Sequence, residues 1–156
     1  MSAVVSRPAR LYQVLALAEM VTWTLLLLGM AGKYLLDLGE VGSRIGGGIH
    51  GFVFLAYCLV TVLIAVDQRW SLRDLALGLG SAVLPYATVP FERYAERRGL
   101  LGQTWRLHTD EPGGSHERLV GLAVRRPVQA GLVGLLSVTV VFATLLTLGP
   151  PTRWFG

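Results

Sequence analysis

Two long runs of this 156-residue chain contain no Asp, Glu, Lys or Arg, and they constrain the fold more than any other feature. The two runs are Ile49–Val66 and Val128–Leu148. A helix of about 20 mostly apolar residues crosses the hydrocarbon core of a bilayer. Charged residues make up 15% of the whole chain, whereas a soluble domain carries about 25%. The sequence therefore predicts a helical membrane protein and argues against a soluble enzyme.

Two further runs complete the predicted bundle. Leu11–Ala31 is long enough to span the membrane and has Glu19 near its middle as its only charged residue. Leu75–Phe91 is shorter and contains Pro85. We predict an all-α fold, a polytopic membrane protein with a four-helix transmembrane bundle. Two alternatives stay open: the first run as a cleaved signal peptide, and the third as a re-entrant or interfacial segment.

The distribution of arginine and lysine predicts an orientation and a division of the chain. With four spans, the 67–74 turn and both termini share one side, which carries five basic residues, and the other side carries nine. Because basic residues favour the cytoplasmic side, we predict a cytoplasmic 92–127 loop and both termini outside. The chain then divides into a three-span domain (1–98), a basic interfacial loop (99–127) and a fourth span with its tail (128–156).

A set of short motifs in the first 98 residues follows the order of one known family. In chain order they are Glu19, Thr22-Trp23, Leu25–Leu28, Lys33-Tyr34, His50-Gly51, Phe54, Tyr57, Trp70, Ser81, Pro85 and Phe91-Glu92-Arg93. In these residues the chain resembles the domain of unknown function 3817 family, small bacterial integral membrane proteins with a His-Gly pair at the start of the second span. The resemblance implies a helical fold in the bacterial plasma membrane and no assigned activity. It also implies that 99–156 is an extension, and Tyr86-Ala87 departs from the small or glycine-containing pair expected there.

Glu19 is the first candidate functional residue, because a charged side chain in mid-membrane costs about 2.5–3.5 kcal/mol. It lies about eight residues, or ~12 Å, inside the first span. Antiparallel packing of the first two spans predicts Thr61 at its level, and a parallel third span adds Ser81. Glu19 is then either a proton or cation site, or a protonated side chain hydrogen-bonded to Thr61, Ser81 or a backbone carbonyl. We expect the face that continues Glu19 to meet other helices; it holds Thr22, Leu26, Gly29 and Lys33.

A second set of candidates lies at the ends of the predicted spans. Lys33 and Tyr34 end the first, His50 and Gly51 begin the second, and Glu92 follows the third. The predicted connections bring all of them to one membrane level, where they could bind an anionic headgroup or admit a proton. The structural alternative is a Lys33–Glu92 ion pair, Tyr34 as an interfacial anchor and close packing at Gly47 and Gly51.

The remaining features predict surfaces rather than chemistry. In the 92–127 loop, arginines are mixed with apolar residues, which suits binding to anionic lipid headgroups. The flanking spans hold these arginines at the membrane, which argues against nucleic acid. His108, Asp110 and His116 have no common metal-site spacing. A stripe of small residues in the fourth span predicts close packing; it consists of Ala130, Gly134, Ser137, Val141 and Thr144.

These features predict a non-enzymatic accessory or interaction subunit of the plasma membrane, with no catalytic residue, cofactor or metal. Its partners would be the lipid bilayer and other membrane subunits or further copies of the chain. The alternative is a small oligomeric transporter or channel component that uses Glu19 as its proton or cation site. The lone Cys58 has no disulfide partner and is interpreted as a small apolar core residue.

Overall fold

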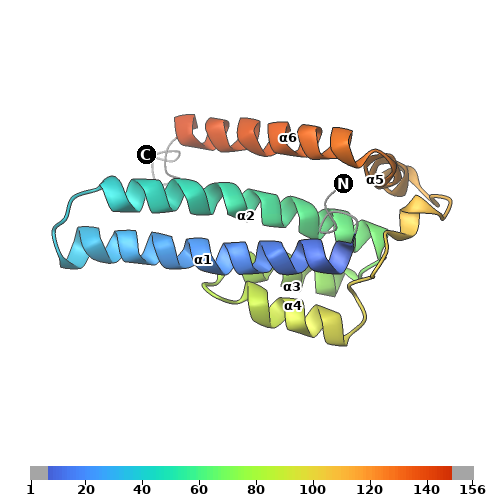
Figure 1. Cartoon of the computed structure of the whole chain (residues 1–156), viewed down its shortest axis with the longest axis horizontal. Coiled ribbons are helices and arrows are strands. Elements are labelled where there is room, and N and C mark those ends of the chain that lie inside the picture. The colour runs from blue at the N-terminus through green and yellow to red at the C-terminus, as the bar shows by residue number, and fades with distance from the viewer. Residues whose placement is uncertain (1–6, 149–156) are drawn as a thin grey trace.

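The computed structural model describes residues 7–148, and within that range the chain is helical and contains no strand. In chain order the elements are α1 (Pro8–Leu35), α2 (Val41–Asp67), α3 (Leu72–Val83), α4 (Thr88–Arg97), the 3-10 turn η1 (Arg106–His108), α5 (Ser115–Arg125) and α6 (Pro127–Leu148). α1 and α2 lie antiparallel, α6 packs on α2, and α3 and α4 pack against the α1–α2 pair on another side (Figure 1). The all-α prediction is confirmed.

Three helices among the described residues, α1, α2 and α6, are long and apolar enough to cross a membrane. They correspond to three of the four predicted spans, although α2 begins at Val41 rather than at Ile49. α6 buries only Val138 among its residues, and most of its leucines and valines are exposed. A monomer in water rarely exposes an apolar patch of that extent, so the surface of α6 is that of a helix surrounded by lipid.

The single span predicted over Leu75–Phe91 is absent, and this part of the sequence prediction is wrong. The segment is divided between α3 and α4, which form a helical hairpin that starts and finishes at the same end of the α1–α2 pair. At that end the Tyr94 hydroxyl donates to the Asp74 carboxyl at 3.0 Å. The Trp70 indole N–H donates to the Leu100 carbonyl at 2.7 Å. The hairpin therefore has the shape of the re-entrant alternative.

Pro85 explains why the hairpin turns where it does. A residue before proline is driven out of the helical region of φ/ψ space, and Leu84 has φ −98° and ψ 127°. Tyr86 then has a positive φ of 65°, and the chain reverses into α4. Pro90 does not interrupt α4, because it lies in the first turn, where its missing N–H breaks no helical hydrogen bond.

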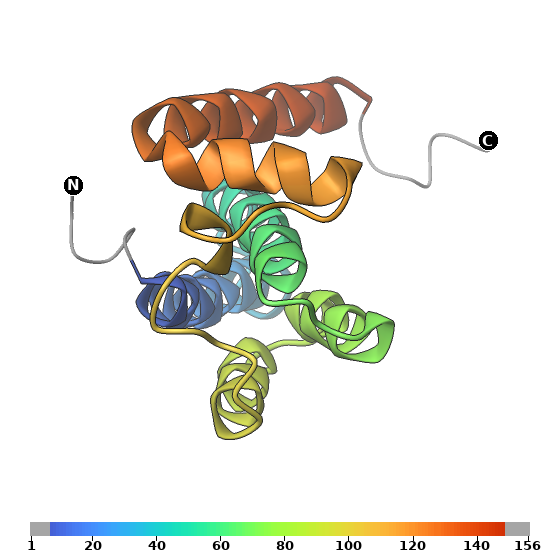
Figure 2. The same ribbon diagram turned by 90° about the vertical axis from the view of Figure 1, so that its right-hand side faces the viewer.

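The two ends of the bundle differ in what covers them. We call the end where α1 begins and α2 finishes the basal end, and the end at residues 36–40 the distal end. η1 and α5 cover the basal end (Figure 2). α6 starts there and runs toward the distal end (Figure 1). The start of α1 and the end of α6 thus lie at opposite ends of the bundle; the termini themselves, for which the sequence predicts a shared side, lie outside the described residues.

The buried core lies between α1, α2 and the α3–α4 hairpin. Its centre is an aromatic cluster in which the Tyr12 and Tyr57 rings lie 5.2 Å apart and Trp70 and Phe91 pack edge-on or tilted around them. Cys58 is half-buried against this core, and its thiol is free, in agreement with its interpretation as a packing residue. The core gives the two long helices a fixed partner in the hairpin.

Candidate functional site

The approach of α1 to α2 is closest near the distal end, and glycines make it possible. A Cβ added at Gly29 would lie 2.5 Å from the Gly42 carbonyl oxygen. A Cβ added at Gly46 would lie 2.8 Å from the Leu25 carbonyl oxygen. Real Cβ atoms do not approach backbone this closely, so the contact requires glycine and fixes the register of the two helices. This register determines which polar side chains meet deeper in the bundle.

The glycine pair named in the sequence prediction has a different role. Gly47 faces only the side chain of Leu26, at 3.6 Å from an added Cβ. Gly51 faces the Phe142 ring of α6, at 3.2 Å. The close α1–α2 contact therefore uses Gly29, with Gly42 and Gly46, whereas Gly51 makes room for α6.

The register places Glu19 of α1 beside His50 of α2. The Glu19 Oε2 atom lies 3.3 Å from the His50 Nδ1 atom, within ion-pair distance but without hydrogen-bond geometry. Glu19 is fully buried, and neither of its carboxyl oxygens has a hydrogen-bond partner among the described residues. Buried polar atoms nearly always have such a partner. This carboxyl is therefore the clearest candidate functional group in the molecule.

The surroundings of His50 orient its ring. The Thr22 hydroxyl donates to the Glu19 carbonyl oxygen at 3.0 Å, and its oxygen lies 3.3 Å from His50 Nδ1. Because that hydroxyl hydrogen is already used, Thr22 offers a lone pair to the imidazole, which favours a hydrogen on Nδ1. The Trp23 ring lies 4.4 Å from the imidazole, centre to centre, and its N–H donates to the Ala82 carbonyl at the tip of the hairpin. The pair can hold a proton on the carboxyl or on the imidazole.

The expected partners of Glu19 belong to a separate network, and that prediction is wrong. Ser81 accepts or donates a 3.0 Å hydrogen bond with the Tyr57 hydroxyl, which also bonds the Tyr12 hydroxyl. Thr61 donates to the Tyr57 carbonyl at 2.8 Å. These hydroxyl groups lie nearer the basal end than Glu19, because Tyr12 precedes Glu19 by about two helical turns. His50 and Thr22 take the place beside the carboxyl.

The predicted convergence of Lys33, Tyr34, His50, Gly51 and Glu92 does not occur. Lys33 lies at the distal end and pairs with Glu40 at 2.8 Å. Glu92 lies on α4, one turn after Thr88, whose hydroxyl donates to the carbonyl of Ala16. Ala16 and Lys33 are about 25 Å apart along α1, so the Lys33–Glu92 pair is excluded. The prediction failed because it treated the hairpin as a full span that finishes at the distal level.

Tyr34 and Glu92 are individually placed as follows. Tyr34 is exposed at the distal end, with the Lys33 ammonium 5.1 Å from its ring centre. Glu92 is buried against α1, and this burial raises the pKa of its carboxyl. Neither residue contacts His50, which leaves Glu19, Thr22 and His50 as the assembled site.

A second polar cluster, which the sequence prediction missed, joins the extension to the basal end. Asp67, the last residue of α2, is fully buried, and its two carboxyl oxygens accept the backbone N–H groups of Arg106 and Leu107 at 3.0 and 2.9 Å. Leu107 is buried beneath α5. An acidic residue immediately after an uncharged span is a weak signal, but it could have marked Asp67 as a capping group. Residues 99–126 are therefore folded onto the bundle rather than lying free as a loop.

Glu117 of α5 completes this cluster. Its carboxyl accepts the Gly113 N–H at 2.7 Å and pairs with Arg69 at 3.1 Å and Arg106 at 2.8 Å. The Gly113 hydrogen bond, followed by the Arg69 hydrogen bond, lowers the pKa of Glu117 to about 2. Arg106 is thus occupied by protein partners and not available to lipid headgroups. No three His, Cys, Asp or Glu side chains within residues 7–148 form a group that could hold a metal ion.

Three span-length apolar helices, with an acid–base pair enclosed between two of them, define the class of this molecule as a helical membrane protein. The chain belongs to the domain of unknown function 3817 family, whose match covers residues 9–97. It is 41% identical over 99 residues to a Streptomyces coelicolor protein named membrane protein SCO5905. That match covers 63% of this chain, and the chain spans about an eighth of the relative, 12% of its length. No solved structure matches the chain.

Proposed function

We propose that this protein is a multi-pass plasma-membrane protein that acts as a non-enzymatic accessory or interaction subunit. The enclosure of the Glu19–His50 pair carries this proposal. Glu19 is fully buried, and Trp23 packs on the imidazole. A pair closed off in this way suits control of helix packing better than passage of a solute. The chain matches only a short part of the longer Streptomyces relative, and this supports a module that serves a larger assembly.

A small transporter or channel component is the second candidate function, and one observation favours it. The Glu19 carboxyl has no hydrogen-bond partner among the residues that the structure describes. Carboxyl groups inside membrane helices often mark proton or cation pathways. In this alternative, Glu19 would exchange a proton with His50 during each transport cycle.

We expect the Glu19→Gln variant to fold and to keep its partners. The amide has the shape of the carboxyl, and the carboxyl has no hydrogen bond to lose, so the unfolding free energy should change by less than about 1 kcal/mol. The measurement combines affinity purification from native membranes with a proton-flux assay in proteoliposomes that contain a pH-sensitive dye. We expect the same partners and the same flux as for the native chain.

The matched control for this experiment is Glu92→Gln, which neutralises a second buried glutamate, on α4. A native chain that carries protons, with flux abolished by Glu19→Gln and retained by Glu92→Gln, would replace the accessory proposal with the transporter. Loss of co-purifying partners in Glu19→Gln alone would instead show that the buried carboxyl sets the helix packing on which assembly depends.

The arrangement in the membrane follows from the position of the basic residues. Within residues 7–148, eleven of the thirteen Lys and Arg residues lie at or near the basal end, and the two exceptions are Lys33 and Arg44. The positive-inside tendency therefore favours a cytoplasmic basal end. The arrangement has three spans and a re-entrant α3–α4 hairpin. The 92–127 segment is cytoplasmic in this arrangement, as the sequence predicts. The start of α1 lies at the same end of the bundle and is therefore also on the cytoplasmic side. Three exposed arginines, Arg93 and Arg97 of α4 and its C-cap Arg98, are placed to contact anionic headgroups.

Cysteine labelling tests this arrangement. In a Cys58→Ala background, we expect Leu38→Cys at the exposed distal loop to react with a membrane-impermeant maleimide in intact cells. Gln103→Cys, exposed at the basal end, should react only after the membrane is permeabilised. Labelling of Gln103→Cys alone in intact cells would reverse the orientation, whereas labelling of both positions would contradict an odd number of spans between them.

A further inference from the structure

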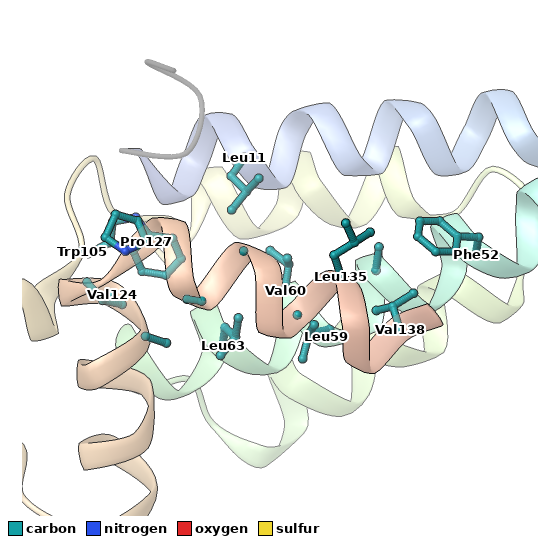
Figure 3. Close-up of a pocket in the computed structure, with 15 residues that line it drawn as sticks. Leu11, Phe52, Leu59, Val60, Leu63, Trp105, Val124, Pro127, Leu135 and Val138 are labelled. Carbon is teal, nitrogen blue, oxygen red and sulfur yellow. The ribbon is translucent and has the colours of Figure 1, made fainter. Parts of the chain in front are cut away.

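A groove between α2 and α6 opens beside the bundle, and we call it the α2–α6 groove (Figure 3). Its volume is about 270 Å³. The α2 wall includes Phe52, Leu59 and Leu63, and the α6 wall includes Gly131 and Val138. Trp105 and the end of α5 line its basal part (Figure 3). Every side chain that lines the groove is apolar apart from the Trp105 indole N–H.

The chemistry and dimensions of the groove favour hydrocarbon. Water is not held in a cavity without polar partners, and a dry apolar cavity of about 150 Å³ already binds benzene. Along α6 the lining runs from Pro127 to Val138, about 16 Å of helix. One leaflet contributes about half of the ~30 Å hydrocarbon core. The groove therefore has the length of one leaflet and room for several methylene groups of an acyl chain.

The basal end of the groove carries positive charge. Arg126 is exposed and immediately precedes Pro127, which lines the groove. Arg125 is also exposed, and its guanidinium is held by the carbonyl oxygens of Leu107 and Asp110 at 3.2 and 3.1 Å. Arginine at the membrane surface pairs with phosphate oxygens through charge-assisted hydrogen bonds. A phosphate at this position would continue directly into a chain that occupies the groove.

We propose that the α2–α6 groove binds one acyl chain of an anionic phospholipid, with the lipid phosphate at Arg126. This site is separate from the Glu19–His50 pair and does not depend on the accessory or transporter function. The lipid chain would complete the packing between α2 and α6 along the groove.

Gly131→Phe tests the groove. A Cβ at Gly131 meets no atom within 4 Å, so the new ring can enter the groove without displacing the backbone. We expect native mass spectrometry of the full-length protein, loaded with phosphatidylglycerol in mild detergent, to show several-fold less retained lipid, because the ring occupies the space that the acyl chain would fill. Leu132→Phe is the matched control, since Leu132 is exposed on the adjacent outer face, and it should retain lipid as the native chain does.

The headgroup part is tested with Arg126→Ala and a second lipid. The native chain should retain phosphatidylglycerol in preference to phosphatidylethanolamine, and Arg126→Ala should remove the preference. Equal retention of phosphatidylglycerol by Gly131→Phe and the native chain, with both showing the same helical circular dichroism, would overturn the acyl-chain site. Equal retention of the two lipids by the native chain would overturn the anionic headgroup.

Discussion

Replacing Gly29 with alanine is expected to lower the free energy of unfolding by about 1–3 kcal/mol. The added Cβ would lie 2.5 Å from the Gly42 carbonyl oxygen and 2.8 Å from the Ser43 nitrogen. Both atoms belong to the backbone of α2, which cannot rotate aside as a flexible side chain does. α1 and α2 must therefore separate, and the register that holds Glu19 beside His50 loosens with them. Thermal unfolding of the purified protein in detergent, followed by circular dichroism, measures the effect.

The matched control is Gly32→Ala, one turn further along the same helix. Its Cβ would meet only the Leu38 side chain, at an ordinary contact distance of 3.7 Å. Because alanine favours helix more than glycine does, this variant should be as stable as the native chain or slightly more stable. Equal destabilisation by the two substitutions would show that glycine is required at both positions for a reason other than helix contact.

The glycines at the start of α2 also explain an error in the sequence prediction, which is the residue at which the second helix begins. The run from Val41 to Gly48 contains Arg44 and four glycines, which are unfavourable in a helix interior. The predicted span begins after this run, at Ile49, where the uncharged stretch starts. A helix that begins at Ile49 places Thr61 opposite Glu19. The actual start at Val41 moves His50 to that level, because Gly42 and Gly46 are helical and form the contact with α1. Tertiary packing outweighs the local preference of glycine, and a single sequence carries no direct sign of it.

The features of the fold that could be predicted from the sequence are those that the lipid bilayer determines. The uncharged run Val128–Leu148 differs from α6 by one residue, because a span is set by the thickness of the bilayer. Glu19 stood out for the same reason, as the only charged residue in an apolar span. Leu75–Phe91 was ambiguous because its length lies at the lower limit for a span, and Pro85 decided in favour of a hairpin. The partner of Glu19 could not be predicted, because it depends on the α1–α2 register.

Replacing Asp67 with alanine is expected to detach residues 99–126 from the basal end. The two carboxyl oxygens accept the N–H groups of Arg106 and Leu107 in a fully buried position. Each N–H left without an acceptor costs about 1–3 kcal/mol. The Leu107 side chain, buried beneath α5, would lose the anchor that holds it there. Hydrogen–deuterium exchange should show faster exchange in residues 99–114, whereas the α1–α2 contact near the distal end keeps its protection.

The matched control for this prediction is Asp110→Ala, which removes an acidic residue from the same segment. Asp110 is exposed and lies 3.8 Å from Arg106, and such surface ion pairs contribute at most about 1 kcal/mol. Its exchange pattern should therefore resemble that of the native chain. If Asp67→Ala exchanged no faster than Asp110→Ala, the packing of Leu107 and the Glu117 ion pairs would be sufficient to hold the segment. Faster exchange throughout α1 and α2 would instead show that the basal cluster stabilises the whole bundle and that the extension is part of its cooperative fold.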